Sequence, residues 1–364
     1  YSGTTSVKVG SLVLSGANGS VLNSSGITIG AAGTFVLNNT FLSNHSNRVK
    51  DNGTVTMNGG TLRFQHNGGA ADYSESVGTV SLSSGANTVI ASQAASNQTS
   101  TLTITSLTRG SGTVNFVGVG LGTDTRNRIL IGGLSNGLIG PWATVNGTHL
   151  AAYDSTRGVC AAEETVYTDI AARGPSSVIA NNASSNIRIN SDGVSGDITL
   201  AAATNTINTL LQNTATPATV ATAGRTFRVS GVIIPSGKAA VTLGDTAGDG
   251  TLSSATSGGT LALANDSASD LRVNAVIADN AAASALNPAG SGKVILAAAN
   301  TFSGETAGSG GSLVLAHGAA LQNSTLTVGT AAPVFDSAVA GHAFTLGGLT
   351  GTGELPLNDG AGNA

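Results

Sequence analysis

The stretch NTFSGETAGSGGSLVL, Asn300–Leu315, indicates the fold of this chain, because residues 1–14 repeat it as YSGTTSVKVGSLVL. Tyr1 aligns with Phe302, the Ser-Gly pairs that follow coincide, and both copies end on the same five letters, Gly-Ser-Leu-Val-Leu. The two copies lie roughly 300 residues apart in the chain. Such a self-match is typical of repeat architectures, in which similar coils stack on one another.

The composition also favours a chain of many short strands. Only 9% of the 364 residues are charged, against about 25% in an ordinary globular protein. Yet 40% are hydrophobic, which argues against disorder driven by charge. The apolar residues occur in short groups between Gly, Ser, Thr and Asn, and this arrangement is typical of strands joined by tight turns.

Alternation of apolar and polar residues predicts the strands directly, since half-buried strands have a period of two. The segments with this pattern are Ser11–Leu14, Gly26–Ile29, Thr34–Leu37, Thr54–Met57, Thr61–Phe64, Thr79–Leu82, Thr101–Ile104, Thr113–Val117, Asn186–Ile189, Asp197–Leu200, Thr226–Val229, Ala240–Leu243, Thr260–Leu263, Lys293–Leu296, Ser312–Leu315, Thr325–Val328 and Ala343–Leu346.

A sandwich or a barrel would also explain strands at this spacing, but a recurring phrase, Gly-x-Leu-x-Leu with variants, favours a solenoid. Each copy would supply one strand of one coil, with its glycine at a corner that admits no side chain. We predict an all-β, right-handed parallel β-helix with one irregular inserted segment. With about 20–25 residues per coil, the chain would form roughly 15 coils. The phrase begins at Gly10, Gly60, Gly78, Gly112, Gly259 and Gly311.

One segment, Pro141–Pro175, breaks this rhythm, because it holds the single Trp, the single Cys and a group of charges. It is expected to be a widened coil or a hairpin that leaves the solenoid, with a boundary near Gly174–Pro175. The predicted organisation is therefore solenoid coils over residues 1–140, the irregular segment over 141–175, and further coils over 176–364. Ala281–Gly290 is expected to be a loop.

Ala299–Gly329 resembles the autotransporter-associated β-strand repeat. That repeat reads approximately as Gly-x-Leu-x-Leu, then Asn-Thr-Tyr/Phe-Ser/Thr-Gly-x-Thr, then Gly-Ser/Thr-Leu-x-Leu, and residues 292–329 carry these parts in this order. Ile139–Val159 is also similar to a phrase found in long surface proteins with such repeats. The resemblance implies a large exported bacterial protein with a β-helical stalk, on the cell surface as a passenger, an adhesin or a fibre. No active site accompanies the repeat.

Charge and cysteine content limit the partners. The net charge is −4 with scattered Lys and Arg, so nucleic acid is not expected to bind. No run reaches the 18 or so apolar residues of a membrane helix, and we expect no membrane insertion. A single cysteine, Cys160, cannot form an internal disulfide. The five histidines lie far apart, and we expect neither a metal nor another cofactor.

An enzyme is the main alternative, because polysaccharide lyases and hydrolases also use β-helices. Glycoside hydrolysis needs two carboxylates about 5–10 Å apart. The candidates are in the irregular segment, where a solvated loop with internal ion pairs is the simpler interpretation. They are Asp154, Glu163, Glu164, Asp169 and the neighbouring Arg157.

Aromatic residues of the same segment offer a second alternative, a carbohydrate-binding module. Trp142, Tyr153 and Tyr167 would form a platform on which sugar rings stack, although a core position for Trp142 is the simpler interpretation. Ser135, in a Gly-x-Ser-x-Gly match, and the pair Asp245 and Asp249, a calcium loop by composition, are both interpreted as parts of turns.

The sequence therefore predicts an extracellular structural or adhesive solenoid without catalytic activity. Surface glycans are candidate partners. Because the repeated phrase is found at both ends, the unit is expected to associate end to end, covalently or by stacking, with Tyr1, Ser2 and Gly3 in the contact.

Overall fold

The protein is all-β, and its strands stack as parallel coils into a β-solenoid of about 13 turns. In the residues that the computed structural model describes, helical geometry is limited to two 3-10 turns, η1 Glu164–Val166 and η2 Ala340–His342. None of the described helices is long and apolar enough to cross a membrane. The described residues are 2–40, 44–67, 72–94, 97–110, 112–307, 312–329, 332–351, 353–359 and 361–362.

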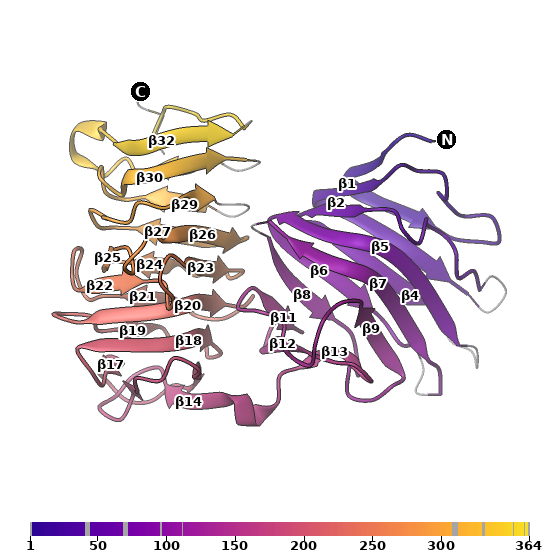
Figure 1. The fold of residues 1–364 in the computed structure, drawn as a ribbon, viewed down its shortest axis with the longest axis horizontal. Coiled ribbons are helices and arrows are strands. Elements are labelled where there is room, and N and C mark those ends of the chain that lie inside the picture. Colours follow the sequence, from indigo (N-terminus) through magenta and orange to yellow (C-terminus); the bar gives the residue numbers. More distant parts are fainter. Residues whose placement is uncertain are drawn as a thin grey trace. The chain divides into compact units, whose positions relative to one another are not determined.

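The chain divides into two compact units, Tyr1–Ala162 (unit 1) and Glu163–Ala364 (unit 2), and this division falls inside the irregular segment 141–175. Figure 1 shows the strands of both units and labels many of them. Unit 1 contains β1 Thr5–Leu14, β2 Ile27–Asn39, β3 Val55–Asn58, β4 Thr61–His66, β5 Tyr73–Ser84, β6 Ala86–Ala91, β7 Ser100–Arg109, β8 Thr113–Val117, β9 Asn127–Ile131, β10 Gly137–Leu138, β11 Ala143–Val145, β12 His149–Asp154 and β13 Gly158–Ala161. Unit 2 contains β14 Tyr167–Ala171, β15 Val178–Ile179, β16 Asn186–Ser191, β17 Thr199–Leu200, β18 Thr204–Gln212, β19 Ala218–Val220, β20 Thr226–Ile234, β21 Val241–Leu243, β22 Thr251–Ser253, β23 Thr260–Asn265, β24 Leu271–Val273, β25 Val276–Ile277, β26 Ala285–Gly290, β27 Lys293–Leu296, β28 Thr306–Ala307, β29 Ser312–Leu315, β30 Leu321–Val328, β31 Val334–Phe335 and β32 Leu346–Gly351.

Unit 1 is a ladder of long coils. The order β2-β4-β6-β8-β11 forms one side and β2-β3-β5-β7-β9 continues from it, because β2 is long enough to pair with both β3 and β4. Leu62 pairs with Val89, and Val89 pairs with Phe116, so these two successive turns have the same length. That length exceeds the predicted range, which is one reason why the chain forms fewer turns than expected.

Unit 2 has shorter coils near its end. Its main sheet runs β14-β16-β18-β20-β23-β26-β28-β30-β32, and a second sheet runs β19-β21-β24-β27-β29-β31, all with parallel pairing. Leu286 pairs with Thr306 and Thr306 with Leu326, so the turns here are shorter than those of unit 1. Coil length therefore varies along the chain.

Alternation places apolar side chains inside and hydroxyls outside, as the sequence predicts. In β4, Leu62 and Phe64 are fully buried, while the residues between them are only partly buried. The outward position before each core residue carries a small polar side chain in successive coils. These residues, aligned by the strand register, are Ser11, Thr34, Thr61, Thr88 and Asn115.

Gly60, a corner glycine of the phrase, has the role that the sequence predicts, whereas Gly10 does not, because a Cβ atom on Gly10 would have no atom within 4 Å. A Cβ atom on Gly60 would lie 2.4 Å from the carbonyl oxygen of Gly30 and 2.5 Å from a methyl carbon of Ile29. No side chain fits at that separation. Gly311, the corner of the last copy, lies outside the described residues.

Antiparallel pairing is found where the rhythm breaks. β12 pairs antiparallel with β10, β11 and β13, while β11 still pairs parallel with β8. Of the two forms expected for residues 141–175, the part up to Ala161 therefore has hairpin geometry. Beyond η1, β14 pairs parallel with β16 and belongs to the coils of unit 2.

The prediction of a loop over Ala281–Gly290 is wrong for half of that segment. Its second half is the strand β26, which pairs parallel with β23 along its whole length. The prediction was wrong because Leu286–Gly290 are all buried, so the segment lacks the alternation of a half-exposed strand.

The second copy of the repeated phrase ties three coils together. Asn300 is buried, accepts the Ile277 N–H (2.8 Å) and donates to the Ala320 carbonyl (2.9 Å). Phe302 is 1% exposed and lies in the core.

Its threonine completes a hydroxyl contact that we call the Thr–Ser clasp. The Thr306 hydroxyl lies 2.8 Å from the Ser324 hydroxyl, and the latter donates to the Gly304 carbonyl (2.6 Å). Ser324 belongs to the following coil, so the clasp fixes one coil to the next.

The first copy forms the same clasp. The Thr5 and Ser24 hydroxyls lie 2.9 Å apart, and Ser24 donates to the Gly3 carbonyl (2.9 Å). Thr5 and Gly3 are the residues that align with the clasp residues of the second copy. The self-match in sequence is therefore also a match in hydrogen bonding.

Candidate functional site

The densest charged cluster lies on the first coils of unit 2 and centres on Arg188. Arg188 in β16 is the register partner of Asp169 in β14. Its guanidinium donates two bonds to that carboxylate (2.7 and 2.8 Å) and two to Glu164 (3.2 and 2.5 Å). The guanidinium also lies 4.3 Å from the centre of the Tyr167 ring. The Arg188 side chain is only 4% exposed.

Electrostatics in this cluster favour fixed charges over proton transfer. Hydrogen bonding to Asp169 and Glu164 raises the pKa of Arg188, and the bonds from Arg188 lower the pKa of Asp169. A general acid needs a raised pKa. The geometry therefore suits a fastening between β14 and β16, in which one buried cation joins two carboxylates.

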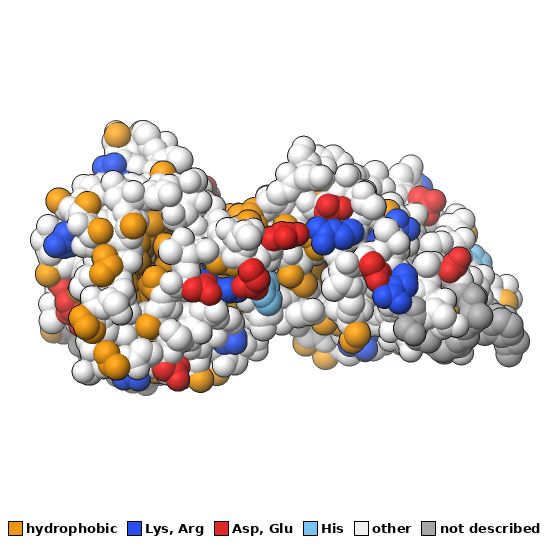
Figure 2. Space-filling view, turned by 90° about the horizontal axis from the view of Figure 1, so that it is seen from below, with side chains coloured by type: hydrophobic (Ala, Val, Ile, Leu, Met, Phe, Trp, Pro, Cys, Tyr) orange, Lys and Arg blue, Asp and Glu red, His pale blue; other side chains and the backbone are white. Residues whose placement is uncertain are grey.

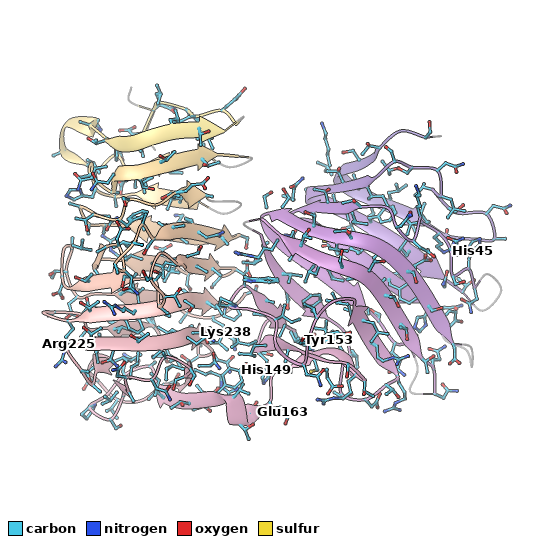
Figure 3. All side chains as sticks on the ribbon, viewed as in Figure 1. His45, His149, Tyr153, Glu163, Arg225 and Lys238 are labelled. Atoms are coloured by element: carbon cyan, nitrogen blue, oxygen red, sulfur yellow. The ribbon has the colours of Figure 1, made fainter. Side chains whose placement is uncertain are left out.

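The other predicted carboxylates form local contacts. Asp154 accepts the N–H groups of Thr156 and Arg157 (2.9 and 2.8 Å), which lowers its pKa, and its other oxygen lies 3.6 Å from the Arg157 guanidinium. Glu163, labelled in Figure 3, accepts the Val166 N–H through its backbone carbonyl (3.0 Å). Asp154 and Arg157 belong to unit 1, whereas Glu163, Glu164 and Asp169 belong to unit 2.

Two of the three aromatic candidates pack against the core of unit 1. Tyr153, labelled on β12 in Figure 3, is 9% exposed, and its hydroxyl accepts the Ile131 N–H (3.3 Å). A stacking platform needs an open ring face, so Tyr153 is corrected from a candidate sugar contact to a core residue. Trp142 packs against the same core, and the Arg109 guanidinium lies 5.2 Å from its ring centre.

The third candidate, Tyr167, belongs to unit 2. It is partly buried, and the Arg188 guanidinium covers one face of its ring. A sugar ring would have only the opposite face available. In the predicted sugar-stacking platform, Tyr153 therefore offers no open ring, and Tyr167 offers at most one ring face.

The predicted end-contact residues are partly described. Tyr1 lies outside the described residues, and Ser2 is exposed. Gly3 accepts bonds at its carbonyl from the Ser24 hydroxyl (2.9 Å) and the Ser25 N–H (3.1 Å). Gly3 thus acts in the Thr–Ser clasp through its backbone.

The turn candidates remain turns. Ser135 lies between β9 and β10, so a strand and not a helix follows it. In the loop of Asp245 and Asp249, the Asp249 carboxylate accepts the Asp245 N–H (3.2 Å), and the Asn274 amide binds both the Gly244 and Asp245 carbonyls. A search of the described residues finds no group of three metal-ligating side chains.

A cavity of about 210 Å³ lies at the last coil of unit 2. Two rings in contact, Phe335 and Phe344, with centres 4.8 Å apart and planes tilted by 54°, give it an apolar wall. The Nδ1 atom of His342 lies 2.9 Å from a carboxylate oxygen of Asp359 at the same cavity. The cavity is at the end of the core and not on a coil face.

Sequence reasoning missed a second charged cluster, Arg48 and Glu75, which is fully buried in unit 1. One signal was present: in Tyr73-Ser-Glu-Ser-Val77, alternation places Glu75 on the same inward face as Tyr73 and Val77. Arg48 carries no such signal, because it lies in a segment without strand periodicity.

Figure 2 shows one face of the molecule, on which most of the surface carries neither charged nor hydrophobic side chains. Comparison of the chain with protein-family models, with curated proteins and with solved structures found no match. The resemblance of Ala299–Gly329 to the autotransporter-associated repeat therefore stays a prediction from those residues.

Proposed function

We propose that this chain is a structural or adhesive element of a bacterial surface, secreted and assembling end to end into a longer solenoid. The observation that carries the proposal is the Thr–Ser clasp, which is built in the same way at Thr5 and at Thr306. Coils of one type near both ends favour the stacking of a coil from another copy. The surface location rests on the resemblance of Ala299–Gly329.

Strand edges supply the second support. Among the described residues, β1 pairs with β2 alone and β32 with β30 alone. Edge strands carry backbone groups ready to pair with another chain. Apolar side chains are exposed beside these edges, with Val9 79% and Leu349 58% exposed. Burial of these residues would favour stacking.

The neutral outward ladder is the third support. Ser, Thr and Asn side chains are solvated without charge, so stacked coils do not repel one another. A long solenoid can then remain soluble while its ends associate. The same ladder would give a fibre a uniform polar surface, which is suited to a structural role.

The test is the mass of the purified chain against concentration, by sedimentation velocity and negative-stain microscopy. We expect species that lengthen with concentration and fibres along the coil axis. Val9→Lys should weaken association at least about tenfold, because a charge would be buried at the joint, and about 1.4 kcal/mol suffices for that factor. Val119→Lys is the matched control, since Val119 is 84% exposed in the loop between β8 and β9 and not on the edge strand β1.

A monodisperse monomer at every concentration would refute end-to-end assembly. Equal weakening by Val9→Lys and Val119→Lys would refute the joint at β1, because it would reflect added charge in general.

A further inference from the structure

A carboxylate interrupts the apolar core of unit 1. The register of β5, β7 and β9 stacks Glu75 on Leu102 and Leu102 on Ile129. All three are buried, and Glu75 is only 1% exposed. This stack of inward side chains therefore ends on an ionisable group. Burial of such a group is unfavourable unless it has hydrogen-bond or charge partners.

Arg48 is that partner, and it joins several segments. Both Glu75 carboxylate oxygens accept the Arg48 backbone N–H (3.1 and 3.2 Å). The Arg48 side chain, 0% exposed, donates to the Asn39 amide oxygen (2.8 Å) and to the carbonyls of Gly16 (3.0 Å) and Gly19 (2.7 Å).

The segments joined in this way lack strand ladders of their own. Residues 15–26 connect β1 to β2, and residues 44–54 precede β3, and neither segment contains a strand. One backbone bond joins them directly, from the Val21 N–H to the Arg48 carbonyl (2.8 Å). The buried cluster therefore contributes to the closure of both segments over the core, beside the Thr–Ser clasp at Ser24.

We propose that Glu75 and Arg48 form a pH-sensitive latch, in which ionisation of Glu75 loosens segments 15–26 and 44–54. The latch needs no second copy of the chain, and its test is separate from that of end-to-end assembly, although segment 15–26 contains Ser24 of the Thr–Ser clasp. Opening of either segment returns the carboxylate to water, so the protonated form favours the closed state and the ionised form favours the open state.

The direction of the pH dependence follows from the pKa. Burial raises the pKa of Glu75 to about 7; the Arg48 N–H opposes this, the charge of Asp51 adds to it, and the charge of Arg48 opposes it. Since the closed state binds the proton more tightly than the open state, latching is strongest below about pH 4.5. It weakens as pH rises through about 7.

A neighbouring histidine would act in the opposite direction. His66 stacks on Tyr73, which lies two residues before Glu75 (ring centres 4.2 Å apart). Burial lowers the pKa of His66, so its protonation in acid would loosen the region. The sign of the pH effect therefore distinguishes the two groups.

Hydrogen exchange of the full chain, corrected for intrinsic rates and followed from pH 5 to pH 8, tests the latch. We expect protection of segments 15–26 and 44–54 to fall about tenfold or more over this range, since one pKa unit is a tenfold change. Amides of β18, in unit 2, serve as the internal reference. His66→Gln should retain the trend.

Glu75→Gln keeps an oxygen acceptor but cannot ionise, so protection should become independent of pH. Glu75→Leu, which matches the apolar column of Leu102 and Ile129, is a second variant in case the amide of Glu75→Gln disturbs folding. Protection of segments 15–26 and 44–54 should be independent of pH in this variant as well. An unchanged trend in both variants, or a wild-type chain without the trend, overturns the proposal.

Discussion

Buried amide side chains provide much of the polar bonding in this sparsely charged chain. Asn87, 2% exposed, accepts the Gly59 N–H (2.8 Å) and donates to the carbonyls of Ser84, Gly85 and Thr113 (3.0, 3.1 and 3.0 Å). Asn300 has the same role in unit 2. One neutral side chain thus satisfies backbone groups of three successive coils at a corner, where the strand ladder is interrupted.

Replacement of the Asn87 amide should lower the free energy of unfolding substantially. Asn87→Ala leaves several buried backbone groups unpaired, and we expect a loss of about 2–4 kcal/mol in the free energy of unfolding. Chemical denaturation monitored by circular dichroism measures it. Asn52→Ala, at an exposed position, should change stability by less than about 0.5 kcal/mol. Similar losses in the two variants would contradict the corner role.

At the scale of the coil, a corner glycine is a steric requirement. We expect Gly60→Ala to destabilise by about 2–3 kcal/mol, because its Cβ would overlap the Gly30 carbonyl and the Ile29 side chain. Gly224→Ala is the comparison: Gly224 has a φ of +63° and no atom within 4 Å of its Cβ, so only backbone strain of about 1 kcal/mol is expected. Thermal denaturation of both variants would show whether crowding outweighs strain.

Strands with one exposed face could be predicted from the sequence more readily than strands buried on both faces, although Asn186–Ile189 and Thr260–Leu263 were predicted despite such burial. Thr61–Phe64 and Thr101–Ile104 alternate strictly, and both were predicted within β4 and β7. β18 was missed entirely: its first half alternates, but its second half, in which Leu210, Leu211 and Gln212 are buried in succession, lacks the period of two. β26 was taken for a loop for the same reason. Burial of both faces removes the period of two on which the prediction depends.

Stacking of residues from different coils could not be predicted, and the buried cluster of unit 1 shows why. Glu75 meets Arg48 only because the coils of unit 1 are longer than those near Thr306. Without the coil length, spacing in the sequence does not say which side chains lie above one another. At the Arg188 cluster, Glu164 and Asp169 were candidates from the sequence, but Arg188 itself escaped prediction for the same reason.

At the scale of the whole molecule, the two units have separate apolar cores. Phe64 lies in the core of unit 1 and Phe302 in that of unit 2, and each is at most 1% exposed. We expect two calorimetric transitions, with Phe64→Ala lowering one midpoint and Phe302→Ala the other. Each truncation should cost about 3–5 kcal/mol. A single transition lowered by both variants would mean that the units unfold together.

The equal turns that join Leu62, Val89 and Phe116 in unit 1 also set how its gene can change. Because these three residues follow one another at a constant interval, loss of one interval would bring Leu62 directly against Phe116 with every side chain still on its own face. Loss of a single codon would turn the strand inside out. Gain or loss of one whole interval would therefore extend or shorten the molecule by one turn, whereas a single-codon insertion or deletion in a strand would exchange its inner and outer faces.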